Sequence, residues 1–322
     1  MKAAIFDAYG GKNAIKVQET DMPVPDKHQI LIKVKATTVT AVDAIFRSGS
    51  NVFARMATGL ISPKIKTLGT ELSGVVEKVG EKVTAFKAGD EVIADSGTNY
   101  GAHAEYVLVA DQDPIVHKPE YLSFKEAAAV SYGSLTALAF LRDHGKIKNG
   151  DRVLIIGASG SVGSYAVQLA KYYGAEVAGV SSSKNSLLVK SMGADHIIDY
   201  RKTPLSDLKG QFDIIFDAVG KYSIRKTKHL LKPEGKYLTT VLSLRSLFDM
   251  MRTVRNKQKS ILAFTGLRNN EDKTADLRMV ADLFKHHRLS SIIDREYPLD
   301  AISDAFDYVS HGHKSGSVVI TI

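Results

Sequence analysis

The spacing of hydrophobic and polar positions changes near residue 122. Before that point, short apolar runs at 30–36, 73–79, 91–94 and 105–109 are separated by Gly, Pro and Asp. Runs of this length between turn-forming residues are typical of strands in a small barrel. From Ser123 on, apolar residues at helical spacing predict helices over 124–130 and 135–141, with Ser123 and Glu126 as a capping box. A domain boundary near residue 122 is therefore expected.

Beyond residue 150 the pattern alternates between strands and helices. We predict strands at 153–156, 176–181, 196–199, 212–217, 237–241 and 261–264. Helices are predicted at 186–192, 224–231, 276–286 and 301–309, and a last strand at 317–322. Such alternation indicates a parallel sheet with helices on both faces, so the fold class is α/β with a doubly wound sheet.

The run VLIIGASGSVG at 153–163 predicts a phosphate cradle. Four apolar residues suited to a buried strand lead directly into three glycines, and an apolar helical pattern follows. Glycine lets the backbone approach a pyrophosphate, and the helix N-terminus offers free N–H groups and the positive end of its dipole. The expected contacts to a dinucleotide come from Gly157, Ala158, Ser159, Gly160, Ser161 and Val162.

Composition excludes several classes of protein. The 322 residues are enough for two domains, and 44% hydrophobic with 24% charged residues is typical of a soluble globular chain. No apolar run approaches the roughly 20 residues of a membrane span, and no signal peptide is recognised, so we expect a cytoplasmic protein without stable membrane insertion. The absence of cysteine removes disulfides, thiolate metal sites and cysteine nucleophiles. The net charge of +8 is spread along the chain, which argues against nucleic acid and suits an anionic cofactor.

The loop after the second strand of the alternating region favours NADPH over NADH. An NAD site carries an acidic residue about 20 residues past the glycine turn, but no acidic residue occurs from Val177 to Ala194. Ser182, Ser183 and Lys184 stand there instead, and hydroxyls with an ammonium suit a 2′-phosphate. The alternative for Lys184 is an ordinary solvated loop lysine.

The segment 244–259 predicts an amphipathic helix. Leu244, Leu247, Phe248, Met251 and Val254 recur at helical spacing, and five basic residues lie on or near the polar side. We expect the apolar side to pack on its own domain. The alternatives are a lid over the substrate pocket, a dimer contact and a weak contact with a membrane surface.

Four motifs carry a family resemblance: LGTELSGVVEKVG at 68–80, FKAGDEVI at 86–93, GAHAEY at 101–106 and FDAVG at 216–220. Together with the glycine run, the chain resembles the medium-chain dehydrogenase/reductase superfamily, and most of all its zinc-independent quinone oxidoreductase branch, which includes zeta-crystallin. The resemblance implies a GroES-like β-barrel catalytic domain of residues 1–122 and 267–322 around a Rossmann NADP-binding domain of residues 123–266. It also implies a homodimer, which is common in the branch.

Zinc-dependent members of the superfamily carry a ligand histidine where this chain has Thr70. A hydroxyl does not replace an imidazole in such a site, and cysteine ligands are missing, so we expect no metal. The pair His311 and His313 is interpreted as solvated.

The resemblance also implies the remaining site residues. The branch has an Asn-x-x-Asp pattern and then a tyrosine where this chain has Thr40, Asp43 and Ile45, so we expect a more apolar acceptor site. Thr40, Asp43 and Tyr132 are the catalytic candidates, each with a structural alternative: a strand residue, a loop anchor and a packed ring. Further cofactor contacts are expected from Thr136, Tyr200, Val219 and Val241.

These observations predict an NADPH-dependent reductase that transfers a hydride to a quinone or an α,β-unsaturated carbonyl without zinc. Such acceptors are already electron-poor and need less activation than an alcohol or aldehyde. Two alternatives stay open: an NADP-dependent alcohol or aldehyde reductase, and a non-catalytic NADPH-binding protein.

Overall fold

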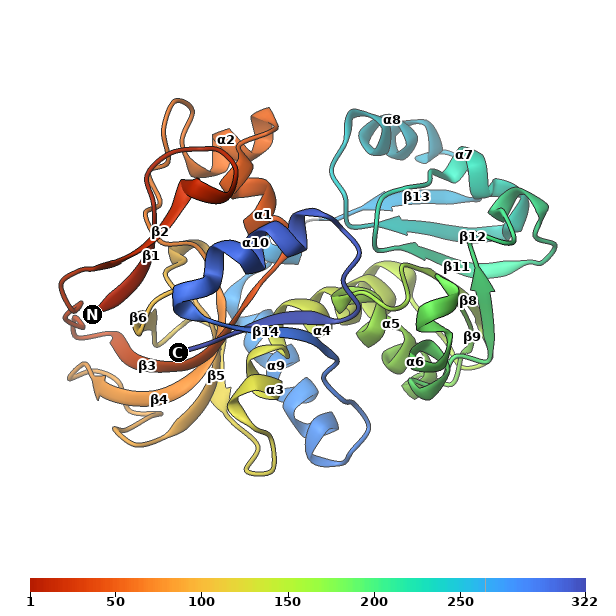
Figure 1. Ribbon diagram of the computed structural model, residues 1–322. Coiled ribbons are helices and arrows are strands. Elements are labelled where there is room, and N and C mark those ends of the chain that lie inside the picture. Colours follow the sequence, from red (N-terminus) through yellow and green to blue (C-terminus); the bar gives the residue numbers. More distant parts are fainter. Residues whose placement is uncertain (264) are drawn as a thin grey trace. The chain divides into compact units, whose positions relative to one another are not determined.

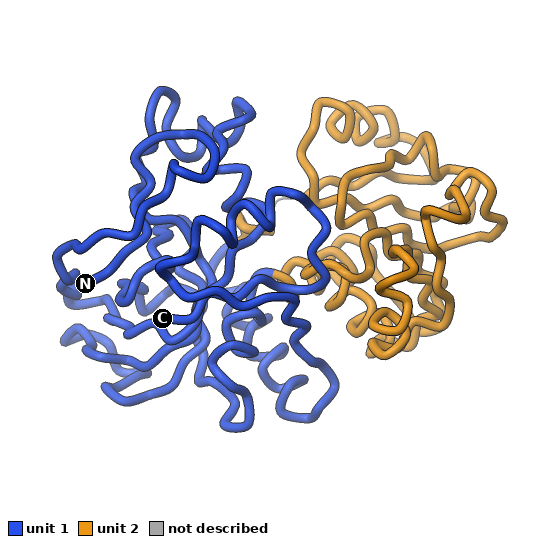
Figure 2. The backbone as a smooth tube through the Cα atoms, viewed as in Figure 1, with its two compact units in different colours: residues 1–132, 269–322 blue, residues 133–268 orange. Residues whose placement is uncertain are grey.

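The computed structural model describes residues 1–263 and 265–322. The chain divides into two compact units, shown in different colours in Figure 2: unit 1 comprises residues 1–132 and 269–322, and unit 2 comprises residues 133–268. Part of the strand predicted at 261–264 falls on residue 264, outside the described residues. Within the described ranges, no helix combines the length and the hydrophobicity that crossing a bilayer requires.

Unit 1 is built around a seven-stranded sheet. The strands of that sheet are β3 (Gln29–Val39), β4 (Glu71–Val79), β5 (Glu91–Asp95), β6 (Tyr106–Ala110), β7 (Ile115–His117), β14 (Ile293–Pro298) and β15 (Ser317–Thr321). Unit 1 also contains the strands β1 (Lys2–Phe6) and β2 (Ile15–Glu19). Its helices are α1 (Ala41–Ser48), α2 (Val52–Thr58), α3 (Phe124–Ala128), α9 (Asn270–Lys285) and α10 (Ile302–Ser310), with α4 (Ser131–Leu138) beginning here and ending in unit 2.

The sheet of unit 1 contains strands from both the N-terminal and the C-terminal part of the chain. The strand order is β14-β15-β3-β4-β5-β7, with β6 also paired to β3, while β1 and β2 form a separate antiparallel pair. The C-terminal strand β15 pairs antiparallel with β3, and Val318 lies opposite Val39. The final residues therefore hold the end of β3, which leads directly into α1.

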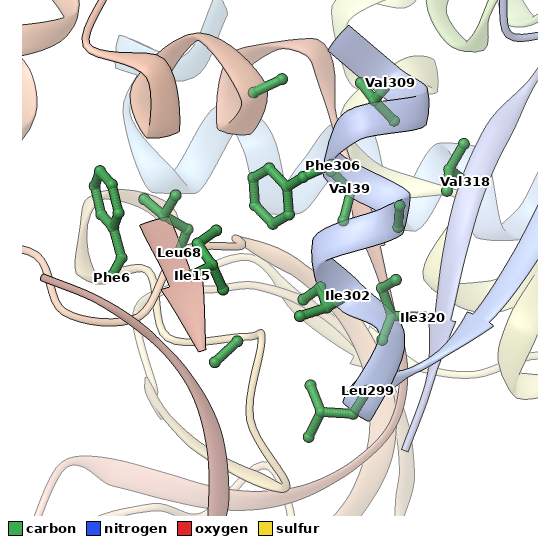
Figure 3. Packing of buried hydrophobic residues seen from close by; sticks show 13 residues of the cluster. Phe6, Ile15, Val39, Leu68, Leu299, Ile302, Phe306, Val309, Val318 and Ile320 are labelled. Atoms are coloured by element: carbon green, nitrogen blue, oxygen red, sulfur yellow. The ribbon is translucent and has the colours of Figure 1, made fainter. Parts of the chain in front are cut away.

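A hydrophobic cluster under α10 fixes that end of β3 (Figure 3). Ile302, Phe306 and Val309 recur at helical spacing and are buried. They pack in one cluster with Val39 and Leu68, the residues next to Thr40 and Gly69. Figure 3 shows these side chains converging from α10, β3 and the loop before β4. Fully burying each of them contributes about 1.5–3 kcal/mol.

Unit 2 is a doubly wound parallel sheet. Its strands are β8 (Arg152–Ile156), β9 (Glu176–Ser181), β10 (His196–Asp199), β11 (Phe212–Asp217), β12 (Leu231–Thr239) and β13 (Lys259–Leu262), in the order β10-β9-β8-β11-β12-β13. The helices are α5 (Ser161–Tyr172), α6 (Ser186–Ser191), α7 (Ile224–Thr227) and α8 (Leu244–Thr253), and a π-helix, η3 (Ala139–Gly145), continues α4. In Figure 1, α5 and α6 lie on one side of this sheet and α7 and α8 on the other. The expected α/β fold is confirmed.

Some local structure differs from the prediction. Helices α1 and α2 were not predicted, and α4 begins at Ser131 rather than at residue 135, so that Tyr132 lies in its first turn. Helix α3 lies in unit 1, where Ala128 packs with Ala36 and Val319, and the domain boundary expected near residue 122 stays a prediction. Helix α8 ends at Thr253. The expectation that α8 packs its apolar side on its own domain is wrong, because Leu244, Phe248, Met251 and Val254 are exposed.

Candidate active site

The glycine turn in unit 2 joins β8 to α5 in a shape that only glycine permits at two positions. Gly157 has φ +80°, and a Cβ there would lie 2.4 Å from Val219 Cγ2. A Cβ on Gly163 would lie 2.0 Å from the Gly157 carbonyl oxygen. Gly160 has an ordinary φ and is the N-cap of α5, where it brings no capping side chain. The first amides of α5 are therefore not covered by a cap, as a site for phosphate requires.

The neighbouring loop is held by Asp217 at the end of β11. This buried carboxylate accepts the backbone N–H groups of Val219 (3.0 Å), Gly220 (2.8 Å) and Tyr222 (2.9 Å), and the Tyr237 hydroxyl (2.8 Å). These four bonds hold the loop after β11 in place, and Val219 of that loop lies against the glycine turn.

Val241, which follows β12, lies against the same loop. A Cβ on Gly220 would lie 2.4 Å from the Val241 Cβ, and the Val241 N–H bonds to the Thr239 hydroxyl at 3.3 Å. Both Val219 and Val241 expose more than a third of their surface, at 53% and 37%. The structure thus brings Gly157, Val219 and Val241 together at the carboxyl ends of three adjacent strands, where open α/β sheets bind ligands.

The predicted phosphate loop follows β9. Ser182 is buried, Ser183 and Lys184 are exposed, and the Asn185 amide donates to the Ser159 hydroxyl at 2.9 Å, which ties the loop to the glycine turn. Tyr200 follows β10 and is flanked by two cations, Arg201 at 5.8 Å and Lys221 at 5.7 Å from its ring centroid.

One acidic residue in this region was not predicted from the sequence. Asp199, the last residue of β10, accepts a hydrogen bond from the Ser183 hydroxyl. That bond and the backbone N–H of Arg201 hold the pKa of Asp199 below its ordinary value. The loop predicted to hold the 2′-phosphate therefore carries a carboxylate as well as Lys184, and Asp199 already accepts the hydrogen bond of the Ser183 hydroxyl.

Thr136 lies on α4 within unit 2. Its side chain is buried, and its hydroxyl lies 3.3 Å from the Thr265 hydroxyl. The Thr136 side chain is therefore shielded from solvent, and its hydroxyl is paired with that of Thr265.

In unit 1, Thr40 and Asp43 form the N-terminal cap of α1. The Thr40 hydroxyl donates to Asp43 Oδ2 at 2.6 Å, and the Thr40 N–H donates to the same oxygen at 2.8 Å. The Asp43 N–H donates to the Thr40 hydroxyl at 3.2 Å, and Gly69 N–H donates to Asp43 Oδ1 at 3.3 Å. Both residues are buried. These bonds engage the hydroxyl and both carboxylate oxygens, so the pair anchors the start of α1; the catalytic role expected for Thr40 and Asp43 stays a prediction.

His103 packs beneath this cap. Its Nε2 lies 2.9 Å from the Thr38 carbonyl oxygen, so Nε2 carries the proton, and its ring meets Phe306 edge to face. Burial lowers the pKa of His103, with Asp43 opposing the shift. Nδ1 is buried and, among the residues that the structure describes, has no hydrogen-bond partner. Gly69, at φ +84°, allows this packing, because a Cβ there would lie 2.4 Å from the His103 ring.

Tyr132 is connected to the rest of unit 1 through Glu71. The Glu71 carboxylate accepts the Tyr132 N–H at 2.7 Å and the Thr38 hydroxyl, and Glu71 is 2% exposed. Burial raises the pKa of Glu71 to about 7, against the two hydrogen bonds. Burial, with Asp43 and Glu71 adding to it, also raises the pKa of Tyr132. The Tyr132 phenol therefore stays protonated and can donate a hydrogen bond.

A lysine lies in the same electrostatic neighbourhood. The Lys314 ammonium donates to the Gly316 carbonyl oxygen at 2.6 Å. Burial lowers the pKa of Lys314 to about 8, although Glu71 and Asp294 favour its charged form. Lys314 was not singled out from the sequence, because nothing in the pattern around it indicates a buried ammonium.

Apolar side chains are exposed on α1, α2 and the residues after α2. Ile45 is 41% exposed, in the place of the tyrosine expected for the branch. Val42, Val52, Phe53, Met56, Leu60 and Ile61 are also exposed. Both short helices therefore leave apolar side chains in contact with solvent instead of packing them into the core of unit 1.

Comparison with known proteins assigns the family. The profile described as "Alcohol dehydrogenase GroES-like domain" matches residues 26–120, and the profile described as "Zinc-binding dehydrogenase" matches residues 192–320. A quinone oxidoreductase of Homo sapiens is 30% identical over 322 residues, which cover 97% of this chain and 94% of the human protein. The chain belongs to the medium-chain dehydrogenase/reductase superfamily, in its quinone oxidoreductase branch.

Two further relatives agree. An NADPH-dependent alkenal/one oxidoreductase of Arabidopsis thaliana, a chloroplastic protein, is 31% identical over 338 residues, which cover 99% of this chain and 79% of that protein. The structure of a quinone oxidoreductase from Coxiella burnetii superposes with a TM-score of 0.89 at 29% identity and covers 100% of this chain and 99% of that one. The expected superfamily, and its combination of a GroES-like and a Rossmann domain, are confirmed.

The name of one matched profile implies zinc, and the residues present do not fit it. A zinc site needs three or four converging His, Cys, Asp or Glu ligands. Over residues 1–263 and 265–322, no three such side chains come together in a way that could hold a metal ion, and Thr70 offers only a hydroxyl. Chemistry through a bound zinc ion therefore does not suit the side chains of the described residues.

Four residues of the candidate site lie in recognisable sequence patterns. Thr40 and Asp43 have the Thr-x-x-Asp spacing of a capping box, which predicts the start of α1. Glu71 and His103 lie inside the two family motifs at 68–80 and 101–106, but their burial depends on contacts that the sequence does not display.

Proposed function

We propose that this protein is an NADPH-dependent oxidoreductase that transfers a hydride to a quinone or an α,β-unsaturated carbonyl without zinc. The observation that carries the proposal is the uncapped N-terminus of α5 behind the glycine turn, with the loop of Ser182, Ser183 and Lys184 tied to that turn through Asn185. Membership in the quinone oxidoreductase branch supports a nicotinamide cofactor and an oxidoreductase activity.

In the proposed complex, the pyrophosphate lies on the turn from Gly157 to Val162 and the nicotinamide side of the cofactor lies near Val219 and Val241. Lys184 and Tyr200 hold the 2′-phosphate, with Arg201 and Lys221 adding positive charge around the ring of Tyr200. Bound NADPH supplies a hydride. The residues of unit 2 position and orient it, and the exposed apolar side chains of Val219 and Val241 keep water from that end of the site.

On the acceptor side, the proposed donor is the phenol of Tyr132. When a hydride adds to the β-carbon of an enone, the electron pair moves to the carbonyl oxygen, and a donor held there stabilises the developing charge. Tyr132 is protonated throughout the neutral range because its pKa is raised. Glu71 fixes the backbone of Tyr132, and the cap of Thr40 and Asp43 fixes α1, so these three residues act as positioning residues.

The exposed apolar residues of α1 and α2 favour an apolar acceptor over a small hydrophilic one. Ile45 and Phe53 can contact the carbon skeleton of an enone or a substituted quinone, and they offer it no hydrogen bond. The hydroxyl of Thr70, in the place of a ligand imidazole, supports chemistry without zinc. A homodimer and a cytoplasmic location belong to the same proposal.

We also propose the domain division 1–122 with 267–322, and 123–266, which differs from the two compact units around α3, α4 and residues 267–268. Limited proteolysis with mass spectrometry of the fragments tests it. Cleavage in the segment before α3 is expected, and cleavage only after Tyr132 would contradict it.

The proposed activity is tested by following NADPH oxidation with the purified protein and a panel of quinones, enones and aldehydes. We expect turnover with quinones or enones, and unchanged rates after treatment with a chelator. Turnover with aldehydes alone would indicate an aldehyde reductase. Tight NADPH binding with no turnover on any acceptor would indicate a non-catalytic binding protein.

A further inference from the structure

Helix α8 is built with its polar side inward and its apolar side outward. Leu244, Phe248, Met251 and Val254 are 80%, 49%, 64% and 63% exposed. In contrast, Ser246, Asp249 and Thr253, at helical spacing on the opposite side, are buried. This arrangement is the reverse of the usual one for a helix on the surface of a globular domain, where the apolar stripe faces the core.

The inward side of α8 is held by specific hydrogen bonds, so the orientation is fixed by the chain itself. The Ser246 hydroxyl donates to the Val241 carbonyl oxygen at 3.0 Å, and Ser243 and Ser246 form a capping box. The Thr253 hydroxyl donates to the Asp249 carbonyl oxygen at 2.9 Å and accepts the Ser260 N–H at 2.9 Å. Rotating the helix to bury its apolar side would break the bonds to Val241 and Ser260, which lie outside α8.

The outward side carries charge of one sign. The only acidic residue in the sequence from 244 to 259 is Asp249, and it is buried, lining a small cavity together with Arg245 and Tyr237. Every basic residue of the segment is exposed: Arg245, Arg252, Arg255, Lys257 and Lys259. Arg252 lies over the ring of Phe248 at 5.4 Å, so the basic and apolar side chains are adjacent.

We propose that α8 and the basic residues after it form a docking surface for an anionic membrane. An exposed apolar stripe beside Arg and Lys is the composition of a helix that lies in the interface of a bilayer. The apolar side chains would enter the headgroup region, and the basic residues would contact acidic lipid headgroups at its surface.

The size and chemistry of the surface favour a membrane over a protein partner. A ten-residue helix is only about 15 Å long, so its apolar stripe alone supplies a part of the roughly 800 Å² per partner of a standard protein interface. Reversible binding to a charged bilayer needs less area, because apolar insertion and electrostatic attraction add together. Docking would also bring the protein to the phase in which apolar quinones and enones concentrate.

The test is sedimentation of the full-length protein with vesicles made of equal parts phosphatidylglycerol and phosphatidylcholine. We expect binding that weakens when salt rises from about 0.1 M to about 1 M, which shortens the Debye length from about 10 Å to about 3 Å. Phe248→Ser with Met251→Ser, and separately Arg255→Glu with Lys257→Glu, should each weaken binding at least about tenfold.

Matched control variants in unit 2 distinguish an effect of α8 from a general effect of the protein's hydrophobicity or net charge. Leu187→Ser removes an apolar side chain that is 83% exposed on α6, and Lys190→Glu with Lys209→Glu makes the same charge change elsewhere. Both should bind like the unmodified protein. Equal binding to pure phosphatidylcholine vesicles, equal losses in the control variants, or full binding by the Phe248 and Met251 variant would each overturn the proposal. One further result would overturn the proposal: the unmodified protein does not bind vesicles and is a dimer, and Phe248→Ser with Met251→Ser converts it to monomers. That result would show that the surface binds a second copy of the chain.

Discussion

The carboxylate of Glu71 accepts the backbone N–H of Tyr132 at 2.7 Å, across 61 residues of sequence. This bond joins β4 to the first turn of α4 and supplies an acceptor at a helix N-terminus, where a negative charge is favourable. The same carboxylate also accepts the Thr38 hydroxyl of β3. The placement of the proposed donor therefore depends on a buried carboxyl group whose pKa, at about 7, lies within the physiological range.

Glu71→Gln should change how stability depends on pH. The folded-state pKa is raised from 4.5 to about 7, so the stabilisation from the protonated form is complete below pH 4.5 and is lost as the pH rises through about 7. A shift of this size corresponds to about 3 kcal/mol. The amide of the variant keeps an acceptor for the Tyr132 N–H and does not titrate. Between pH 4.5 and pH 7 the free energy of unfolding of the unmodified protein should therefore fall by about that amount relative to the variant.

Urea denaturation at a series of pH values measures this difference. The groups that face Glu71 are the Thr38 hydroxyl, the Tyr132 N–H, Asp43, Asp95 and Lys314, and all of them are present in both proteins. Glu77→Gln, on the exposed side of the same strand, should leave the pH profile unchanged. A Glu71→Gln profile parallel to that of the unmodified protein would show that Glu71 stays ionised in the fold.

Gly69→Ala should destabilise unit 1 through backbone strain and through a steric clash. Gly89→Ala, which causes the strain without the clash, separates the two effects. Gly69 has φ +84°, and its Cβ would lie 2.4 Å from the His103 ring. Gly89 has φ +93°, but a Cβ there would have no atom within 4 Å. Gly89→Ala should therefore show backbone strain alone, about 1 to 3 kcal/mol. Gly69→Ala should cost about 1 to 3 kcal/mol more, because His103 must move. Equal losses by thermal denaturation would mean that the ring adjusts freely.

The sequence predicted the parts of the molecule whose chemistry is local. The strand, glycine turn and helix from Val153 to Gly163 follow one another directly, and each has its own pattern. The strands β10 and β11 were predicted with the observed bounds for the same reason. The site in unit 1 is different, because Glu71 meets Tyr132 and Thr38 only after β3, β4 and α4 have assembled.

Helix α8 shows a second limit of sequence patterns. Its apolar spacing was predicted correctly, but a hydrophobic pattern identifies a side of a helix and does not state what that side contacts. The hydrogen bonds of Ser246 and Thr253 decide the orientation, and their partners lie in the Val241 loop and at Ser260. Asp199 was missed for a related reason: it ends β10, whereas a ribose-binding acid was expected only after β9.

Lys184→Ala should reduce the preference for NADPH. The unmodified protein is expected to bind NADPH at least about tenfold more tightly than NADH, because an ammonium and hydroxyls favour the 2′-phosphate. The variant should lose most of this difference, with NADH affinity nearly unchanged. Lys190→Ala, an exposed lysine on α6, is the control. Fluorescence titration measures both dissociation constants, and equal constants in the unmodified protein would contradict the assignment of NADPH.

Asp199→Asn should change NADPH affinity in the opposite direction to Lys184→Ala, and the same fluorescence titration measures it. The ionised carboxylate repels a phosphate and holds the Ser183 hydroxyl, so its replacement by an amide should tighten NADPH binding where Lys184→Ala weakens it. A variant that instead loses NADH affinity and leaves NADPH unchanged would show that Asp199 binds the ribose hydroxyls of NADH.

Tyr132→Phe should reduce kcat for enone or quinone reduction about a hundredfold, the usual effect of losing one donor to a developing oxyanion. The dissociation constant for NADPH should not change. Because burial, Asp43 and Glu71 raise the pKa of Tyr132, the unmodified enzyme should show no loss of activity from phenol ionisation up to about pH 10. Tyr100→Phe, a half-buried tyrosine of unit 1, is the matched control. An unchanged kcat in Tyr132→Phe would remove this residue from the hydride step.

Ile45→Tyr should change which acceptors the protein prefers. Ile45 is 41% exposed on α1, so a larger ring can be accommodated there without repacking the core. The phenol would add a hydrogen-bonding group to a surface that is otherwise apolar, and KM should fall for small hydrophilic quinones and rise for long-chain enones. The ratio of kcat/KM values for a hydrophilic and an apolar acceptor, measured at saturating NADPH, reports this change directly. Val52→Tyr, which is 65% exposed on α2, controls for an added aromatic ring. An unchanged ratio in Ile45→Tyr would mean that α1 does not contact the acceptor, and the apolar face would then have to be assigned to a different binding role.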